Sequence, residues 1–417
     1  MRVAALPMTN MTNTANGEKG EPMELLLIAI TCWLLLQLAF TIWNLSQMPR
    51  LGEPVQRQSW EQRYDEFPAS AVSRAHGGKP LLSVLIPARD EERNIRACLE
   101  SISACRADTI ELEILVMNDH SEDDTEAEIY KAMAHDDRIQ LFHGGKLPEG
   151  WLGKSYACHQ LSLHACGEWW LFVDADVRLQ PEALEAAMIT ARAQRTGLIS
   201  GFPRMDTGTW LEHIVVPMMA FIIGYHLPIM MIRRSPRPVF LAVTGAWLMV
   251  HRDSYTRSGG HAHIYNHIVE DMELARAVKQ AGDPVTLADV HRHTSARMYR
   301  NAAEVWEGYK KNIFAGTGRS PLLVLGITLF YGLLFVFPLV VLIWSVCTAQ
   351  FALAGWAGAA VLIGMITKGI IDRFSGKSCW LGLLMPVSAL CLMLILIDSW
   401  IASLNGKGYR WKGRTYG

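Results

Sequence analysis

The uneven placement of charges along this chain restricts its fold more than any other feature. Leu25 to Asn44 carries no charged residue, and neither does Pro321 to Thr367 or Trp380 to Ile397. A helix of about 20 apolar residues is long enough to cross the hydrocarbon core of a bilayer. The first stretch therefore predicts one membrane helix, the second predicts two helices with a turn near residues 349–357, and the third predicts a further membrane segment. Only the region from about Leu81 to Gly318 can fold in water.

The segments outside these regions are short. Residues 1–24 are polar and are expected to form a disordered tail, residues 45–80 a linker, and residues 398–417 a basic tail. The first apolar stretch (25–44) lacks a following small-residue cleavage site, so we interpret it as a membrane anchor rather than a signal peptide. Met23 is an alternative translation start.

Charge and cysteine content exclude some classes of protein. The formal net charge is −1, which argues against nucleic acid as a partner, because a nucleic-acid-binding protein presents a basic face. None of the eight cysteines forms a Cys-x-x-Cys pair, so we expect reduced thiols that are buried or face the membrane.

The water-soluble region alternates between strand and helix patterns. Nearly continuous apolar runs predict strands at 81–87, 112–117, 139–142 and 169–173, and helical spacing predicts helices at 94–104, 126–134 and 155–165. This alternation predicts an α/β fold with a parallel sheet.

Charged residues follow three of these strands. The first strand runs into Pro87 to Glu92, the second into Asn118-Asp119, and the fourth into Asp174-Ala175-Asp176. Ligands of such sheets bind at the carboxyl ends of the strands, so these residues should meet at one edge. Asp174 and Asp176 point the same way because side chains alternate along a strand, and such a pair suits a divalent cation that also binds phosphates. The alternative is that they are ordinary polar loop residues.

The motifs at these strand ends carry a family resemblance. Residues 84–92, 116–123 and 173–176 resemble the family 2 inverting glycosyltransferases with the GT-A fold. Further motifs resemble one group within this family, the membrane-bound carotenoid (diaponeurosporenoate) glycosyltransferases. These motifs are residues 150–158, 297–299, 304–308 and the tail 411–416. Similar signatures occur in hopanoid and ceramide enzymes. The resemblance implies a GT-A domain over residues 81–318 that transfers a hexose from a UDP-sugar to a lipid acceptor, with inversion; a carotenoid acid is one candidate acceptor.

The resemblance also assigns roles on the donor side. Asp176, with Asp174, would bind Mg²⁺ or Mn²⁺, and Asp119 would accept a hydrogen bond from the uracil imide. The nucleotide-sugar-binding residues implied in this way are Pro87, Arg89, Glu91, Asp119, Lys154 and Asp174. Lys154 would reach the phosphates; the alternative is a solvated loop lysine.

Glu270 and Asp271 open a predicted helix, and in the resembled family such a pair supplies the general base, usually the Asp. A helix cap also explains acidic residues at this place. Residues expected on the acceptor side or in the tail are Arg297, Trp306, Trp411 and Arg414.

Five histidines near the predicted base admit two interpretations. They are His261, His263, His267, His291 and His293. The two His-x-His pairs could bind zinc, but no cysteine or fixed acidic partner completes such a site. We therefore favour polar residues at the rim of the site.

Residues 213–232 are apolar but should not cross the membrane. Asp176 precedes this segment and Asp271 follows it, so a crossing would place the two carboxylates of one active site on opposite sides. Pro217 and Pro228 interrupt the segment. We expect an interfacial helix that brings the lipid acceptor to the site.

The expected location is the cell membrane, with several spans and a cytoplasmic catalytic domain. Three later spans would place the basic tail outside, against the positive-inside rule, so either one segment is re-entrant or the tail is an exception. A polyprenyl-phosphate glycosyltransferase is another enzymatic alternative. A processive polysaccharide synthase is a further one, since residues 407–411 resemble its Gln-x-x-Arg-Trp element. The non-enzymatic alternative is a lipid-binding membrane protein.

Overall fold

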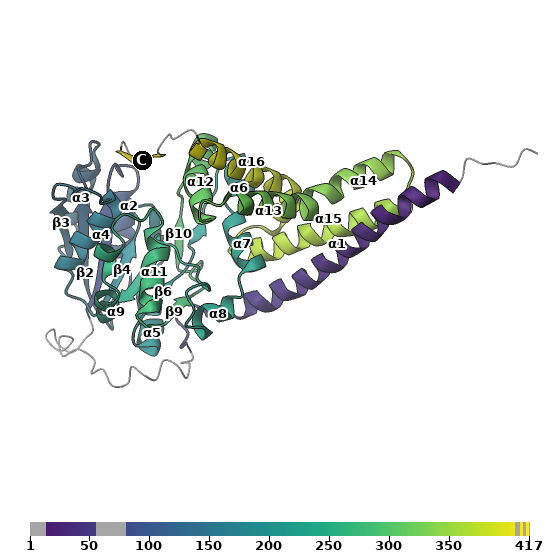
Figure 1. The fold of residues 1–417 in the computed structure, drawn as a ribbon. Coiled ribbons are helices and arrows are strands. Elements are labelled where there is room, and N and C mark those ends of the chain that lie inside the picture. The colour runs from purple at the N-terminus through teal and green to yellow at the C-terminus, as the bar shows by residue number, and fades with distance from the viewer. Residues whose placement is uncertain (1–13, 56–80, 405–408, 412–413, 417) are drawn as a thin grey trace, which may run out of the picture.

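The computed structural model describes residues 14–55, 81–404, 409–411 and 414–416. An α/β domain lies at one end of the molecule and a group of long apolar helices at the other (Figure 1). The predicted tail up to residue 13 and most of the predicted linker (56–80) lie outside the described residues.

The α/β domain is built on a seven-stranded sheet with the order β3-β2-β1-β4-β8-β6-β9. The strands are β1 Leu81–Ala88, β2 Glu111–Asn118, β3 Ile139–His143, β4 Trp169–Val173, β6 Leu198–Ser200, β8 Trp247–His251 and β9 Val285–Leu287. The four predicted strands are confirmed to within two residues, and they pair in parallel.

The sheet as a whole is mixed rather than parallel. β8 lies antiparallel to both β4 and β6, with Trp247 opposite Val173 at the carboxyl end of β4. This direction follows from the path of the chain, which reaches β8 from a segment beside the membrane helices and so enters the sheet at that edge. The expectation of an all-parallel sheet was therefore wrong for β8.

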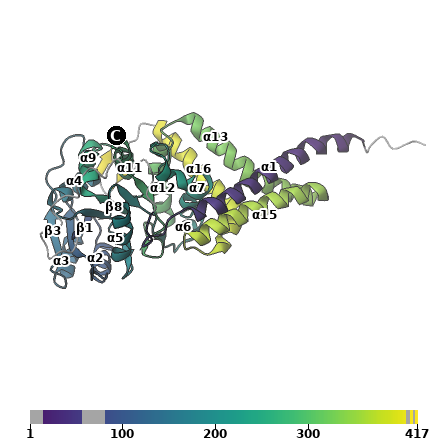
Figure 2. The same cartoon turned by 90° about the horizontal axis from the view of Figure 1, so that it is seen from below.

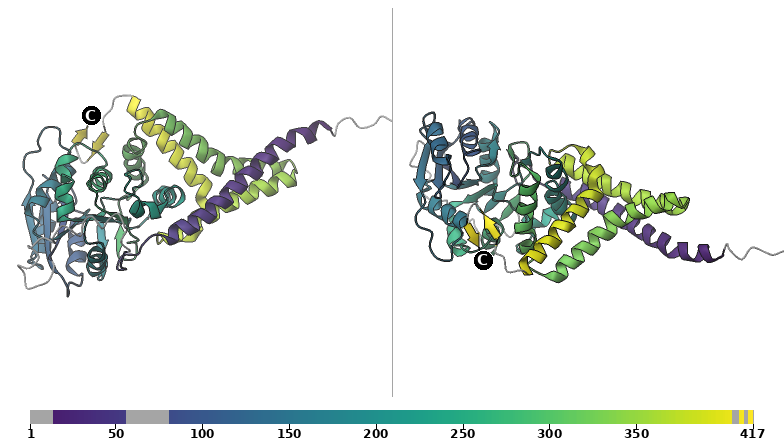
Figure 3. Two further views of the ribbon diagram at one scale, coloured as in Figure 1. Left: turned by 60° about the horizontal axis from the view of Figure 1, so that its bottom comes forward. Right: turned by 90° about the horizontal axis from the view of Figure 1, so that it is seen from above.

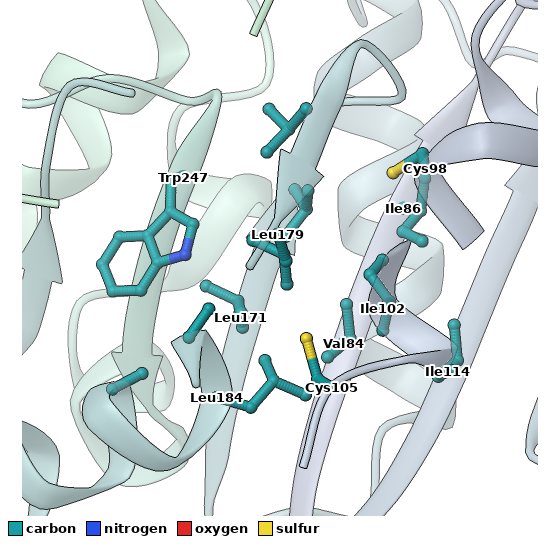
Figure 4. Close-up of a cluster of buried hydrophobic side chains, with 14 of the residues drawn as sticks. Val84, Ile86, Cys98, Ile102, Cys105, Ile114, Leu171, Leu179, Leu184 and Trp247 are labelled. Carbon is teal, nitrogen blue, oxygen red and sulfur yellow. The ribbon is translucent and has the colours of Figure 1, made fainter. Parts of the chain in front are cut away.

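Helices cover both faces of the sheet. Figure 2 shows α2 (Ile95–Ser103), α3 (Thr125–Met133) and α5 (Ala183–Gln194) on one side, and α4 (Gly153–His164), α9 (Arg252–Arg257) and α11 (Glu270–Gln280) on the other. The first face buries Val84, Ile102, Leu171 and Trp247 in one apolar cluster (Figure 4). Burial on both faces explains why the strands read as continuous apolar runs.

A small sheet follows the paired carboxylates. β5 (Val177–Leu179) begins directly after Asp176 and pairs with β10 (Thr294–Ala296), which also pairs with β7 (Arg204–Met205). From β10 the chain continues into α12 (Ala302–Gly316) and then into the membrane-type helices. The segment after Asp176 is therefore joined to the segment that enters the apolar region.

Among the described residues, four helices are long and apolar enough to cross a membrane: Pro22–Ser46, Pro321–Cys347, Phe351–Phe374 and Cys379–Leu404. The first belongs to α1 (Thr14–Ser46), so residues 14–24, expected in the disordered tail, are helical. The second comprises α13 (Pro321–Tyr331), η3 (Gly332–Val336) and α14 (Phe337–Cys347). The turn before α15 (Phe351–Phe374) lies at residues 348–350, earlier than most of the predicted 349–357.

Residues 368–379, which carry the charges between the last two apolar stretches, are mostly the end of α15. Lys368 Nζ lies 2.6 Å from Asp372 Oδ2, and both side chains are fully buried. These two charges, one helical turn apart, pair with each other where α15 packs against η4 (Cys379–Leu384).

The last apolar segment turns back within the apolar region. Before it, Lys377 Nζ donates a hydrogen bond to Thr207 Oγ1 of the α/β domain (3.0 Å). The segment then reaches Met385, which lies beside Gly364 at the middle of α15. α16 (Met385–Leu404) returns, and Asp398 contacts α12 of the α/β domain. Both ends of the segment therefore lie on the side of the α/β domain, as in a re-entrant hairpin.

The tail agrees with this path. β11 (Tyr409–Trp411) and β12 (Arg414–Tyr416) form an antiparallel hairpin. Figures 1 and 3 place the C-terminus beside the α/β domain. The re-entrant alternative thus removes the conflict between the basic tail and the positive-inside rule.

The predicted interfacial helix at 213–232 is not one helix. It consists of α6 (Trp210–Val215), α7 (Met218–His226) and α8 (Ile229–Arg234), which break at Pro217 and Pro228. A single helix was a wrong expectation, because proline lacks the N–H that continues a helix. Met218 and Phe221 are fully buried against the membrane-type helices.

Candidate active site

Three charged side chains from separate elements meet at the carboxyl edge of the sheet. Lys154, in the first turn of α4, places Nζ 2.8 Å from Asp174 Oδ1 and 3.1 Å from Glu270 Oε1. Asp174 directly follows β4, and Glu270 is the first residue of α11. The structure thus brings together one strand end and two helix starts, although they are far apart in sequence.

Lys154 keeps its charge in this position. Burial lowers the pKa of the ammonium, but Asp174 and Glu270 outweigh burial and raise the pKa well above its ordinary value. Lys154 lies in a helix between two carboxylates, which is not the environment of a solvated loop lysine. A fixed cation beside a strand-end carboxylate is suited to binding an anionic ligand.

Asp271 is held by two backbone N–H groups. Its Oδ2 accepts from Gly245 N–H (2.7 Å) and its Oδ1 accepts from Met272 N–H (2.7 Å). Gly245 allows this approach because a Cβ there would lie only 3.1 Å from Lys154 Nζ. Burial raises the pKa of Asp271 to about 7, with Glu270 adding to the rise and Lys154 opposing it. A fixed carboxylate with this pKa is suited to accepting a proton near neutral pH.

Asp176 lies on the other side of Asp174. Its Oδ1 is buried, and no described residue is its hydrogen-bond partner. Burial raises the pKa of Asp176 to about 7, and the charges of Asp174 and Glu91 raise it further. An unpartnered carboxylate oxygen among other carboxylates fits a divalent cation.

The described residues contain no group of three or more His, Cys, Asp or Glu side chains placed to hold a metal ion. The zinc interpretation of the five histidines therefore has no support in this part of the chain. A cation at Asp174 and Asp176 would need further ligands from a substrate, as is usual for Mg²⁺ at phosphate sites.

The loops after β1 and β2 are locked to each other. Arg89 Nη1 donates to Asp119 O (2.8 Å), and both side chains are buried. Asp90 and His120 have φ values of 50° and 54°, in the left-handed region that most residues avoid. Asp90 Oδ1 accepts from Glu122 N–H (2.8 Å), which ties the two loops together. Two of the predicted nucleotide-binding residues thus belong to one rigid rim.

Glu91 and Pro87 occupy different parts of this rim. Glu91 Oε2 accepts from Asn94 Nδ2 (2.9 Å), and Asn94 Oδ1 accepts from Arg300 Nη2 (2.9 Å) just before α12. Pro87 instead lines the pocket that contains Lys154. The first strand end is thereby connected both to the pocket and to the segment that leads to the apolar helices.

The residues expected on the acceptor side lie outside the polar pocket. Arg297 Nε lies 3.5 Å from Glu212 Oε2 at the start of α6, and Trp306 Nε1 donates to Asp398 Oδ2 of α16 (2.8 Å). Trp411 and Arg414 are opposite each other in the C-terminal hairpin. These contacts join the α/β domain to the membrane-type helices.

Lys311 of α12 was missed by sequence reasoning. Burial lowers the pKa of Lys311, and the charge of Glu270 partly opposes this effect. A lysine on an amphipathic helix is ordinarily interpreted as a solvated residue, so no pattern in the sequence distinguishes it. Only the packing of α12 shows that Lys311 is half-buried.

Comparison with known proteins agrees with this geometry. Residues 83–256 match the family model described as glycosyl transferase family 2. The α/β domain is therefore similar to family 2 glycosyltransferase domains, its fold is of the GT-A type, and the protein is a glycosyltransferase.

Two relatives indicate which kind of glycosyltransferase the chain resembles. The chain is 29% identical over 349 residues to a 4,4'-diaponeurosporenoate glycosyltransferase of Staphylococcus aureus. The aligned region covers 80% of this chain and 88% of that relative. A relative of the same name from another strain is 28% identical over 347 residues, with the same coverage. The protein is thus related to carotenoid glycosyltransferases.

A solved structure shows the same fold. The mannosyltransferase PcManGT of Pyrobaculum calidifontis, solved with GDP-Man and Mn²⁺, superposes with a TM-score of 0.51 at 15% identity. The match covers 92% of this chain and 99% of that one. The likeness therefore extends beyond the α/β domain into the apolar helices.

Proposed function

We propose that the protein transfers a hexose from a UDP-sugar to a lipid acceptor with inversion, at the cytoplasmic face of the cell membrane. The observation that carries this proposal is the position of Asp271, fixed by two backbone N–H groups beside the Lys154–Asp174–Glu270 cluster. Transfer from a nucleotide sugar requires a base, a cation and a strand-end carboxylate around one pocket.

The chemistry follows from these groups. Where the acceptor is a hydroxyl, Asp271 accepts its proton while that oxygen attacks the anomeric carbon; an ionised carboxylate, as on a carotenoid acid, attacks without this proton transfer. The bond between the anomeric carbon and the diphosphate oxygen breaks on the opposite face, which inverts the configuration. Lys154 lies where it can contact the departing diphosphate, and groups that stabilise developing charge in this way typically change rates by two or more orders of magnitude.

A divalent cation fits the same site. Asp176, with its unpartnered oxygen, and Asp174 would hold Mg²⁺ or Mn²⁺. The ion would neutralise charge on the diphosphate leaving group. The Mn²⁺ in the solved mannosyltransferase supports a metal of this kind.

A lipid acceptor is supported by the connection between site and membrane-type helices. α12 carries Lys311, whose pKa responds to the charge of Glu270, and continues after four residues into α13 at Pro321. The related enzymes are named for diaponeurosporenoate, a carotenoid acid, and we propose an acceptor of this kind. Hopanoids, ceramides and polyprenyl phosphates are the alternatives.

The orientation rests on the re-entrant path of the last apolar segment. That path places the basic tail on the side of the α/β domain, and short basic segments favour the cytoplasm. The alternative functions predict other geometries. A processive synthase needs a pore of several spans, and a lipid-binding protein without catalysis does not explain the pocket that contains Lys154 and Asp271.

The test is direct. Purified protein in detergent, with Mn²⁺ or Mg²⁺, is incubated with UDP-hexoses or GDP-hexoses and with a carotenoid acid, a hopanoid, a ceramide or a polyprenyl phosphate. Mass spectrometry should find a hexosylated product with a UDP-hexose and the carotenoid acid, with inverted anomeric configuration by NMR. A product formed only from a GDP-hexose, or only on another acceptor, would contradict that part of the proposal.

A further inference from the structure

His261 lies in the same pocket as Lys154 and has no role in the mechanism above. It belongs to α10 (Gly260–His263) and is 3% exposed. The pocket that it lines also contains Lys154, Asp174, Gly245, Glu270 and Asp271. Its ring meets the face of Phe172 edge-on, with ring centres 5.1 Å apart. His261 is therefore part of the pocket wall and not of the solvent-exposed rim.

One ring nitrogen of His261 is already engaged. Tyr255 Oη lies 2.9 Å from Nδ1 and accepts the backbone N–H of His261 at 3.0 Å. Which of Tyr255 Oη and Nδ1 donates depends on the tautomer of the ring. In either case Nδ1 is occupied, and Nε2 is the nitrogen left to contact a ligand.

The ring stays neutral. Burial, together with the nearby charges of Lys154 and His159, lowers the pKa of His261 to about 3. His261 is therefore neutral at any pH at which the enzyme works. Among the described residues, no cluster of His, Cys, Asp or Glu placed to hold a metal ion includes it.

The second nitrogen has no protein partner. Among the described residues, none forms a hydrogen bond with His261 Nε2. The pocket also contains the carboxylates of Asp174, Glu270 and Asp271. A ligand hydroxyl can both donate and accept, so it could contact one of these carboxylates and the imidazole together.

We propose that His261 Nε2 forms a hydrogen bond with a hydroxyl of the hexose of the bound nucleotide sugar and so helps to select the sugar. This inference rests on the proposed function, because it places a sugar nucleotide in the pocket. A hexose carries several hydroxyls, each both donor and acceptor, and so matches a wall of carboxylates with one imidazole nitrogen. The hydroxyls of UDP itself are on the ribose, which is expected at the rim with Asp119, so UDP should not contact His261.

Calorimetric binding of UDP-hexose and of UDP, with Mn²⁺ present, tests the proposal. His261→Phe keeps the aromatic packing against Phe172 and removes the ring nitrogen. It should weaken UDP-hexose binding by about three- to tenfold, the usual effect of one hydrogen bond, and leave UDP binding within twofold. His261→Gln should restore most of the lost affinity because its amide group can donate or accept near the position of Nε2.

His263→Phe is the matched control, since His263 lies on the same short helix but is exposed. It should change neither affinity. Thermal melting of each variant checks that the fold is intact. If His261→Phe melts with the wild type and binds UDP-hexose equally well, or loses UDP and UDP-hexose binding together, the proposal is wrong.

The two hypotheses can fail separately. Wild-type protein that binds GDP-hexose but not UDP-hexose would contradict the proposed donor, and the same pair of variants would then be compared on GDP-hexose and GDP. Wild-type protein that binds no sugar nucleotide would contradict both. Discrimination between glucose and galactose donors should fall in His261→Phe, which a purely structural role would not produce.

Discussion

At the scale of single residues, three neighbouring carboxylates differ in their surroundings and therefore in their chemistry. Asp174 is paired with a lysine, Asp271 is held by backbone N–H groups, and Asp176 has an oxygen with no described partner. A buried carboxylate with few hydrogen-bond donors takes up a proton or a metal ion more easily than an exposed one. The same residue type can thus serve three roles within one site.

The first prediction concerns Asp176. Asp176→Asn should retain the fold but slow transfer by about two orders of magnitude or more, because charge on the diphosphate is then stabilised less well. Steady-state rates at saturating Mn²⁺, with circular dichroism as the fold control, make the measurement. Transfer near the wild-type rate would show that this carboxylate is not a metal ligand.

The second prediction concerns Asp271 and depends on the acceptor. Asp271→Asn should abolish transfer to a hydroxyl acceptor, while UDP-hexose affinity measured by calorimetry stays within a few fold. A carboxylate acceptor is already ionised at neutral pH and needs no base, so transfer to it should fall much less. Loss of donor binding together with activity would point instead to a structural cap at the start of α11.

The third prediction is the pH dependence of transfer to a hydroxyl acceptor. Asp271 acts as a base only when ionised, and its pKa is raised to about 7. Because the ionised form is lost as pH falls, kcat/KM should drop about tenfold per pH unit below 7 and level off above it. Glu270→Gln removes a neighbouring negative charge that raises this pKa, so the drop should shift to lower pH. An unchanged pH profile in Glu270→Gln would show that the fall in kcat/KM is not caused by protonation of Asp271.

Motifs predict some of these residues and not others. Asp174, Asp176, Glu270 and Asp271 could be proposed from the sequence because each lies at a strand end or a helix start. His261 was noticed only as one of five clustered histidines, and its place in the pocket wall depends on the packing of a short helix. Side chains that reach a site from the middle of an element leave no local pattern.

At the scale of elements, periodicity was reliable where an element is regular. β1 to β4 and α2 to α4 were predicted to within two residues at nearly every end, because each buries a simple apolar run or stripe. The direction of β8 and the division of residues 213–232 into three helices were not predicted. Both depend on where the chain returns from the membrane-type helices, which is a tertiary property.

The fourth prediction concerns the contact between η4 and α15. Gly382 packs so closely that a Cβ would overlap Met365 O and the backbone of Gly369. Small residues allow such close contact between apolar helices. Gly382→Ala should therefore destabilise the protein by about 1–3 kcal/mol, the usual effect of overpacking, and lower its melting temperature in detergent.

Gly355 of α15 gives the matched control for this substitution. A Cβ on Gly355 meets open space, so Gly355→Ala should leave the melting temperature unchanged or raise it slightly, since alanine favours a helix over glycine. Equal melting temperatures for Gly382→Ala and Gly355→Ala would show that the re-entrant hairpin is not packed as described.

At the scale of the whole molecule, the path of the last apolar segment decides the topology. Four helices are long enough to span a bilayer, but the fourth segment has both ends beside the α/β domain. Composition alone could not show this, because a re-entrant hairpin and a crossing helix are equally apolar. The charge distribution did indicate a conflict with the positive-inside rule, because four crossings would leave the basic tail outside. The basic residues of this tail are Lys407, Arg410, Lys412 and Arg414.

The fifth prediction tests this topology by cysteine labelling in a cysteine-free background. Thr256→Cys, in the α/β domain, and Ser403→Cys, at the end of α16, should react with an impermeant reagent only from the cytoplasmic side. Gln350→Cys, in the turn between α14 and α15, should react only from outside. Since all three positions are exposed, accessibility within the protein does not bias the comparison. Ser403 reacting from the same side as Gln350 would mean that α16 crosses the membrane. Thr256 and Gln350 reacting from one side would instead mean that α13 to α14 do not cross, so that α12 would not lead directly into a membrane span.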